Sequence, residues 1–317
     1  MLTRRLRKAA LNLSVVALGV AGILTVTHMA IAQPPADAKY TGMKLCLGCH
    51  SVLNAELTKA FEPTWHPKAM QEASAEGAIL ANFDDDTPFL KEQVAYVLGG
   101  SSSHQFYMDK DLKILPGKWN VNAKRWEPHP AGDGVAILGH YTTGFDPVKK
   151  TWNDMGVTCE GCHGPGSTHA TTGKKEAIGA NQTLPAAKQA MVCGTCHSAG
   201  TSKDGKYKFP AGYKWGDDLE KHFTLAEVKG RGYMQQYNEW VGSKHATAGI
   251  SCSTCHEVHG KASANPSQLK DEESRPPRST RRWQVQPLPY AAGHAHLGEP
   301  QVSLVSDSLG SSWGCLL

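Results

Sequence analysis

The sequence predicts a loop-rich fold in which short helices outnumber strands, with a small antiparallel β excursion near residues 105–126. Apolar residues recur at helical spacing in several short windows separated by turn signals. In one window, apolar and polar residues alternate instead. Aromatic residues make up only 8% of the 317 residues, so the side chains alone provide little bulk for a core of ordinary kind.

Four windows predict helices. The clearest covers residues 87–98, because Thr87 provides an N-cap, Pro88 occupies the first turn, and Gly99-Gly100 form a stop. The other helical windows are residues 51–61, 185–197 and 232–243. Residues 105–126 contain turn signals at Asp109–Asp111 and Pro116-Gly117, which favours short antiparallel strands.

The N-terminus is typical of an exported protein. Four basic residues between Arg4 and Lys8 precede an apolar stretch, and small residues at Ala30 and Ala32 suit a signal peptidase. We therefore expect residues 1–32 to be a signal peptide. The apolar stretch is long for a signal core, so the alternative is an uncleaved anchor that attaches the chain to a membrane. Both interpretations place the functional part in the periplasm or another extracytoplasmic space.

The formal net charge of +4 comes from this N-terminal segment, which holds four basic and no acidic residues. Residues 33–317 therefore contain 29 basic (33 minus 4) and 29 acidic side chains. A balanced chain of this kind does not indicate a nucleic-acid partner.

Eight of the nine cysteines fall in four copies of the pattern Cys-x-x-Cys-His. The cysteines are Cys46, Cys49, Cys159, Cys162, Cys193, Cys196, Cys252 and Cys255, and the histidines that follow the pairs are His50, His163, His197 and His256. This spacing is typical of c-type haem attachment, because two thiols add across the two vinyl groups of one porphyrin while the adjacent His reaches the iron. We expect four covalently attached haem c groups, and their propionates make the loaded protein acidic.

Other uses of paired cysteines explain the pattern less well. Zinc sites do not require a His directly after every pair. Disulfides within each pair close loops too short to stabilise a fold. A thioredoxin-like motif occurs once, in a βαβ context that this sequence lacks.

The second axial ligand of each iron decides the function. An iron with His on both faces is saturated and passes electrons, whereas an open face admits small molecules. The best candidates for distal ligands are His66, His169, His245 and His259. Four proximal and four distal histidines make a balanced set, so mostly bis-His coordination is expected and no residue is assigned a catalytic role.

The last residues differ in composition. Residues 33–270 contain 23 Lys and 2 Arg, whereas residues 271–317 contain 4 Arg and no Lys. The switch indicates a disordered extension or the product of a shifted reading frame. We favour the second slightly, and residues 33–270 are then the haem-carrying domain.

The segments CLGCH…TWHPKAM, GVTCEGCHGPGSTH and VCGTCH resemble the multihaem cytochrome c family that includes the electron acceptor of hydroxylamine oxidoreductase. SKHATAGISCSTCHEVHG is similar to a pattern in larger multihaem proteins of the nitrogen and sulfur cycles. The resemblance covers roughly residues 40–265. It implies a mainly α-helical, loop-rich fold organised around closely packed haem pairs. It also implies that His66 and His245 are distal ligands of haems other than their neighbours in the sequence.

The sequence departs from this family in one informative place. Relatives often carry a further haem motif where this chain has Ile137–Tyr141, which contains no cysteine. In the acceptor branch that position resembles a haem with an open face, so its absence disfavours small-molecule chemistry. It leaves His140 as a candidate ligand to a neighbouring haem.

Electron transfer is therefore the favoured function, with a quinol dehydrogenase or a terminal reductase as redox partner. The alternatives are a small reductase or oxidase of nitrogen or sulfur oxyanions at one five-coordinate haem, and a structural subunit of a haem-bearing filament.

Overall fold

The computed structural model describes residues 31–83, 87–100, 103–228, 230, 234–260 and 268–270. The expected signal segment up to residue 30 and the tail from residue 271 lie outside these residues. In the described part of the chain, no helix combines the length and the apolar character needed to cross a bilayer.

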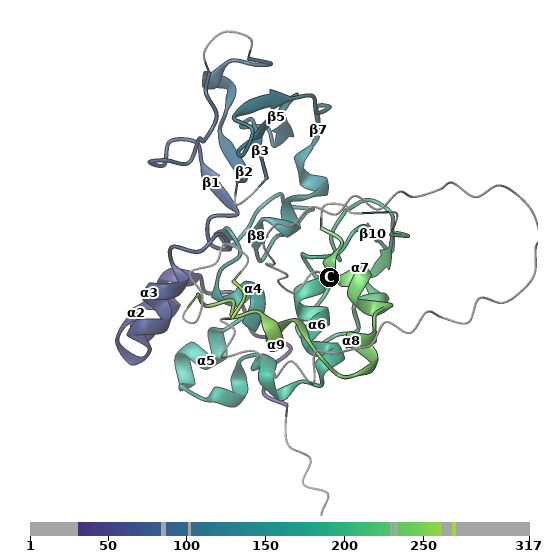
Figure 1. Cartoon of the computed structure of the whole chain (residues 1–317). Coiled ribbons are helices and arrows are strands. Elements are labelled where there is room, and N and C mark those ends of the chain that lie inside the picture. The colour runs from purple at the N-terminus through teal and green to yellow at the C-terminus, as the bar shows by residue number, and fades with distance from the viewer. Residues whose placement is uncertain are drawn as a thin grey trace, which may run out of the picture. The chain divides into compact units, whose positions relative to one another are not determined.

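The elements are short and separated by loops (Figure 1). The α-helices are α2 (Met43–Leu53), α3 (Ala55–Phe61), α4 (Cys159–His163), α5 (Ser167–Thr172), α6 (Ala186–Gly194), α7 (Gln236–Val241), α8 (Lys244–Thr247) and α9 (Cys252–Cys255). The 3₁₀ helices are η1 (Lys91–Gln93), η2 (Gly134–Ala136), η3 (Leu138–His140), η4 (Lys175–Ala177), η5 (Asn181–Thr183) and η6 (Leu219–Lys221). The strands are β1 (Met70–Glu72), β2 (Tyr96–Gly99), β3 (His104–Met108), β4 (Lys113–Ile114), β5 (Lys118–Asn120), β6 (Arg125–Glu127), β7 (Gly132–Asp133), β8 (Thr142–Thr143), β9 (Asp154–Met155), β10 (Gly200–Ser202) and β11 (Phe223–Leu225).

The prediction of a mainly α-helical fold is wrong, although the fold is rich in loops. Residues 70–133 form a seven-stranded antiparallel sheet in the order β1-β2-β3-β4-β7, with β5 paired to β3 and β6 paired to β5. This sheet extends on both sides of the small β excursion expected over residues 105–126. It lies in the segment between the first two Cys-x-x-Cys-His motifs, where the motifs carry no information about the fold.

The predicted helix over residues 87–98 is also wrong. Only η1 is helical there, and β2 pairs with β1 on one side and β3 on the other. Val97 and Leu98 are both buried, on opposite faces of the sheet, in two separate apolar clusters. A strand buried on both faces gives a continuous apolar run, and in a short window such a run also fits a helix. Gly99 and Gly100 have positive φ angles and lead toward β3, so they end a strand rather than a helix.

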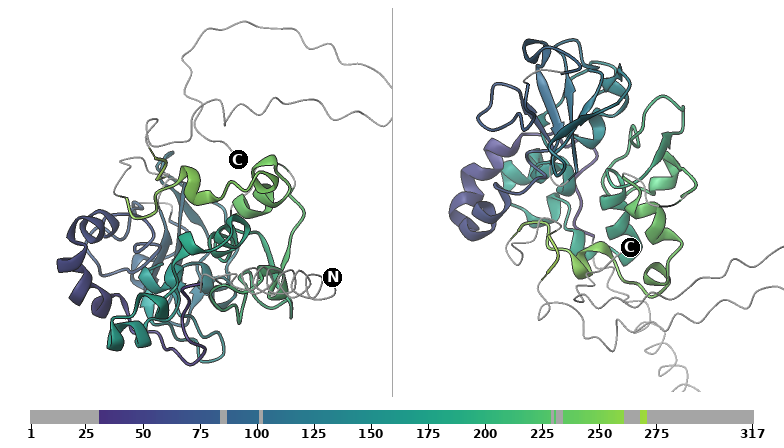
Figure 2. Two further views of the ribbon diagram at one scale, coloured as in Figure 1. Left: turned by 90° about the horizontal axis from the view of Figure 1, so that it is seen from below. Right: turned by 45° about the horizontal axis from the view of Figure 1, so that its top comes forward.

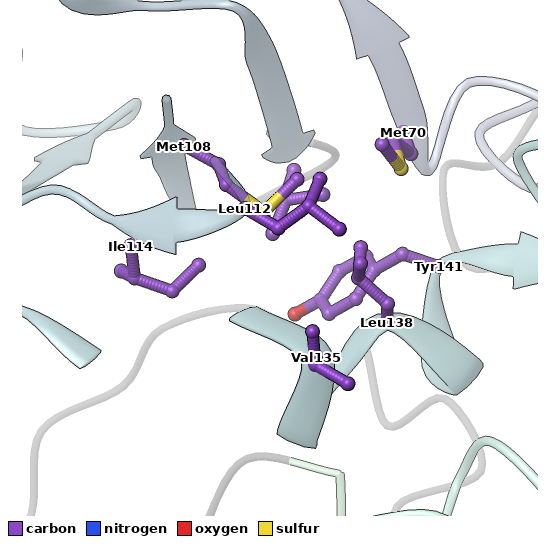
Figure 3. Close-up of a cluster of buried hydrophobic side chains, with 8 residues drawn as sticks. Met70, Met108, Leu112, Ile114, Val135, Leu138 and Tyr141 are labelled. Carbon is purple, nitrogen blue, oxygen red and sulfur yellow. The ribbon is translucent and has the colours of Figure 1, made fainter. Parts of the chain in front are cut away.

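The two faces of the sheet pack different clusters. One contains Met70, Leu98, Met108, Leu112, Ile114, Val135, Leu138 and Tyr141 (Figure 3). The other contains Ala78, Phe89, Val97, Tyr107, Leu115 and Trp119. In Figure 3 the side chains of Val135, Leu138 and Tyr141 come from the segment that follows β7 and meet Met108 and Leu112. The sheet is thereby packed against the segment that leads to the second motif.

A third cluster lies among the later helices. Ala190 of α6, Leu219, Phe223 of β11, and Tyr237 and Trp240 of α7 pack together. α6 also contacts α9, so the elements that carry the third and fourth motifs are adjacent. The right view in Figure 2 shows these later helices gathered together, apart from the strands of the large sheet.

Shortening Leu98 tests the importance of the sheet core. Leu98→Ala removes a side chain that is 0% exposed, so the free energy of unfolding is expected to fall by about 2–5 kcal/mol. Leu90→Ala is the matched control, because Leu90 is 67% exposed and its truncation is expected to change stability by less than about 0.5 kcal/mol. Urea unfolding followed by far-UV circular dichroism measures both. Equal midpoints for the two variants contradict the assignment of Leu98 to the core.

Candidate haem sites

Each Cys-x-x-Cys-His motif coincides with a short helix or a helix end. α2 contains the first motif, α4 consists of the second, α6 ends within the third, and α9 begins the fourth. A helical turn brings residues i, i+3 and i+4 to one face. The two thiols and the histidine of each motif can therefore contact one planar group from the same side.

The cysteines are available for attachment. The eight cysteines in the described part of the chain are all free thiols. Among the same described residues, no three or more His, Cys, Asp or Glu side chains form a group suited to hold a metal ion by themselves.

Helix α2 exposes apolar side chains that an ordinary helix would cover. None of its eleven residues is buried, and Leu45, Val52 and Leu53 are exposed. The same helix carries Cys46 and Cys49. Apolar surface beside an attachment motif fits a bound apolar group that supplies the missing packing.

Three pairs of histidine rings lie against each other, two with nearly parallel planes and the His66–His197 pair edge-on, and each pair joins a motif histidine to a histidine from a distant part of the chain. The ring centroids are 6.1 Å apart for His50 and His169, 6.2 Å for His163 and His259, and 6.2 Å for His197 and His66. These distances test whether an iron fits. A metal–nitrogen bond of about 2.0 Å and about 1.1 Å from that nitrogen to the ring centre, taken on both sides, separate two centroids by roughly 6.2 Å. The spacing fits one iron between each pair.

Hydrogen bonds to oxygen acceptors orient four of these six rings through Nδ1. The Nδ1 atom of His163 lies 2.6 Å from the Gly179 carbonyl oxygen, and that of His169 lies 2.9 Å from the Lys174 carbonyl oxygen. The corresponding partners are the amide oxygen of Gln236 for His197 at 3.4 Å and the carboxylate of Glu257 for His259 at 3.2 Å. At His50 the partner of Nδ1 is instead the side-chain amide nitrogen of Asn54, which donates to the ring over 2.9 Å. Metal-bound histidines commonly use one ring nitrogen in this way, which directs the other toward the metal.

Burial keeps several of these rings neutral. Burial, with a smaller effect of nearby His197, lowers the pKa of His66 to about 4. Burial also lowers the pKa of His163 and of His197. A ligating histidine must be unprotonated, so these environments suit iron binding near neutral pH.

The fourth motif differs from the other three. His256 follows α9 and forms an isolated β-bridge with Leu269, and it lies close enough to His197 to lower the pKa of that ring. His245 lies in α8, a separate short helix, rather than at the end of the helix expected over residues 232–243. Within the described residues, the structure places no other histidine ring against His245.

Thiols of successive motifs lie next to one another. The interaction of the Cys46 thiol with the thiol of Cys159, together with burial, raises the pKa of Cys46. Cys193 and Cys252 are paired in the same way. Burial and the nearby Cys196 raise the pKa of Cys162 to about 12. The four motifs therefore neighbour one another in chain order.

Two acidic residues at the first two motifs were not predicted from the sequence. Glu160 occupies a variable position inside the second motif, is 2% exposed, and accepts hydrogen bonds from residues just before α2. Asp154 accepts a hydrogen bond from the backbone N–H of Met43. A charged residue at a variable motif position looks like ordinary surface, because the sequence does not show burial.

A cavity of about 540 Å³ lies at Ile137, His140 and Tyr141, in the segment where the family resemblance led us to look for a further motif. Its walls are formed by Ile137, His140, Tyr141, Ser198, Ala199, Gly200, Thr201, Lys208, Thr224, Leu225, Ala226 and Met234. His140 is buried and its Nε2 donates to the Lys208 carbonyl oxygen over 2.6 Å. Burial lowers its pKa. The sequence left His140 as a candidate ligand to a neighbouring haem. In the structure, the Nε2 atom of this ring is hydrogen-bonded to the protein backbone.

Comparisons with known proteins agree with the motifs. No protein-family model matches the chain. A segment of 106 residues, 33% of this chain, is 30% identical to the multihaem cytochrome MtrA of Shewanella baltica and covers 21% of that protein. Among solved structures, the outer cell wall cytochrome OcwA superposes with a TM-score of 0.56 and 24% identity, over 73% of this chain and 59% of that one. The undecahaem cytochrome from the S-layer of Carboxydothermus ferrireducens gives a TM-score of 0.46 and 21% identity, over 75% and 42%.

The chain thus spans about a fifth of the curated relative, for which the covered share is 21%, and 59% of OcwA. The resemblance to multihaem cytochromes is supported, whereas the branch containing the hydroxylamine oxidoreductase acceptor stays a prediction. In sequence this chain is similar to a multihaem cytochrome over a third of its length, and in fold it is similar to a solved cell-wall cytochrome.

Proposed function

We propose that this chain is an exported tetrahaem c-type cytochrome that passes electrons between respiratory redox partners through mostly bis-His haems. The facing histidine pairs carry this proposal. The first iron then takes His50 and His169, the second His163 and His259, and the third His197 and His66. His256 holds the fourth iron, and His245 is the remaining candidate for its second ligand.

Haem iron supplies reversible one-electron chemistry, and the residues of the chain determine what that chemistry does. With haem bound, the two rings of each pair would both hold the iron, which would leave no open position for a small molecule. The Nδ1 hydrogen bonds of His163, His169, His197 and His259 hold these four rings in one orientation. A site closed in this way favours electron transfer over bond-making chemistry.

The contacts between motifs support a continuous series of redox sites. Cys46 lies beside Cys159, Cys162 near Cys196, and Cys193 beside Cys252. Because these cysteines anchor porphyrin edges, neighbouring thiols imply neighbouring porphyrins. The series then runs from the first motif to the fourth in chain order.

The proposed location and partners follow from the exported N-terminus and from the named relatives. Residues 33–270 carry the haems outside the cytoplasm, in the periplasm or at the cell surface. The relatives are described as multihaem and outer cell wall cytochromes. A quinol dehydrogenase or a terminal reductase is the proposed redox partner.

The spin state of the oxidised protein tests this function. Electron paramagnetic resonance is expected to show low-spin ferric haem only, because two imidazoles on one iron give a strong ligand field. A pyridine haemochrome assay is expected to give four haems per chain. A high-spin signal that changes when nitrite or hydroxylamine is added contradicts the carrier function and favours an enzyme with an open haem.

A further inference from the structure

The carboxylate of Glu160 joins the second motif to the helix that carries the first. It accepts hydrogen bonds from the Thr41 N–H at 2.9 and 3.0 Å, from the Thr41 hydroxyl at 3.3 Å, and from the Gly42 N–H at 2.8 Å. It also accepts one from the Gly166 N–H at 2.7 Å, just beyond its own motif. A buried carboxylate surrounded by donors in this way is satisfied as an anion.

Asp154 extends this connection. Its Oδ2 accepts from the Met43 N–H at 3.0 Å and from the Thr158 hydroxyl at 2.8 Å. Met43 is the first residue of α2, and Thr158 directly precedes α4. Two carboxylates thus occupy the N-terminal end of α2, where unpaired N–H groups and the helix dipole favour negative charge. Both are tied at the same time to the second motif.

The charges of Glu160 and Asp154 act on the first attachment site, at the thiol of Cys46. The pKa of the Cys46 thiol is raised mainly by its hydrogen bond with Cys159 and by burial, and the charges of Glu160 and Asp154 raise it further. Glu160 also adds to the effect of burial in raising the pKa of Tyr40. Charges in a buried environment interact more strongly than charges in water. A positive charge gained at this site is therefore stabilised.

We propose that Glu160 and Asp154 are positioning residues of the first two haem sites, and that their negative charge lowers the reduction potential of the haems at Cys46 and Cys159. The inference rests on the proposed function, because it takes both motifs to be loaded. Ferric haem carries one more positive charge than ferrous haem, so nearby negative charge favours the oxidised form. Their hydrogen bonds to α2 hold the two attachment helices together, which fixes the distance between the two haems.

Replacing Glu160 by Gln in the complete haem-loaded protein tests this proposal. Gln keeps the size of the side chain but removes its charge. Spectroelectrochemical titration is expected to show one or two haem components shifted to higher potential, with four haems per chain and low-spin signals retained. Glu160→Asp keeps the charge and is expected to leave these components closer to the wild-type values than Glu160→Gln does.

Glu127→Gln is the matched control. Glu127 also accepts hydrogen bonds, from Asn120 and His104, but it lies in β6 of the large sheet. This control is expected to leave all potentials unchanged. If Glu160→Gln does not retain its haems, Asp154→Asn provides the same readout from the second carboxylate.

Unchanged potentials in the haem-retaining variants overturn the inference, and so does an equal shift in Glu127→Gln. These outcomes leave the proposed function standing, because haem content and wild-type spin state test that function separately.

Discussion

Replacing both Cys193 and Cys196 by serine is expected to remove one haem of the four, and with it about a quarter of the haem absorbance per polypeptide. Both thioether bonds of the third site are lost, and His197 alone holds a haem only weakly. Intact mass spectrometry and the pyridine haemochrome assay measure the loss. A protein that still carries four haems contradicts the assignment of these cysteines.

The effect of this substitution is expected to reach beyond one site. Cys193 lies beside Cys252, and Cys196 lies near Cys162, so the third site is the contact between the second and the fourth. Without it, the route from the second haem to the fourth by way of the third is lost. In stopped-flow reduction, one fraction of the remaining haem absorbance is expected to respond much more slowly than in the wild-type protein.

The ninth cysteine supplies a control. Cys315 lies in the tail, outside the described residues and outside every Cys-x-x-Cys-His pattern. Cys315→Ser is expected to leave the haem content at the wild-type value. A loss of haem in this variant as well indicates that the assay reports general damage to maturation rather than a missing attachment site.

The haem motifs can be recognised from the sequence because the chemistry of attachment involves only neighbouring residues. Attachment needs two thiols and a histidine within one helical turn, so all its requirements lie within five residues. The distal partners have no such local signature. His50 meets His169, and His66 meets His197, only because the chain folds back on itself. The sequence identifies these histidines as candidate ligands, but their pairing depends on the fold.

The large sheet escaped prediction for a different reason. Strand β2 is buried on both faces, so Val97 and Leu98 are consecutive apolar residues without alternation. Thr87 and Pro88 then completed an apparent helix start. The family resemblance lay mostly at the haem sites and implied a mainly α-helical, loop-rich fold over roughly residues 40–265. Hydrogen bonds from β1 and β3 make residues 96–99 a strand. Both partner strands lie outside residues 87–98, the window that predicted a helix.

Glu160 illustrates a third reason why part of the site could not be predicted from the sequence. Between two cysteines of a motif, any residue type is compatible with haem attachment, so a glutamate there carries no signal. Its role follows from the backbone of Thr41 and Gly42, which the fold places against it. Buried polar contacts of this kind depend on tertiary structure and are visible only once the chain is folded.

His66→Ala is expected to convert one haem from low-spin to high-spin while all four haems remain attached. The substitution removes the ring that faces His197 at 6.2 Å and leaves every cysteine in place. The iron on His197 then has an open face, which admits water or carbon monoxide. Electron paramagnetic resonance measures the spin change, and a carbon monoxide difference spectrum measures the new binding site.

His104→Ala is the matched control for this prediction. The His104 ring lies at the large sheet, where its Nε2 is 2.9 Å from Glu127, so its loss is expected to leave all haems low-spin. Low-spin haem throughout in His66→Ala indicates that another side chain completes the third site.

The position of His66 makes its variant a clean test of the ring. The backbone carbonyl of His66 accepts a hydrogen bond from the Val157 N–H at 2.7 Å, and alanine preserves this bond. Next to it, Gly156 has φ +80° and leaves no room for a Cβ beside the Pro67 carbonyl, so the two backbone segments are tightly fitted. The loop is therefore held by main-chain contacts that the substitution does not touch. A change of spin state in His66→Ala then reports the missing imidazole rather than a displaced loop.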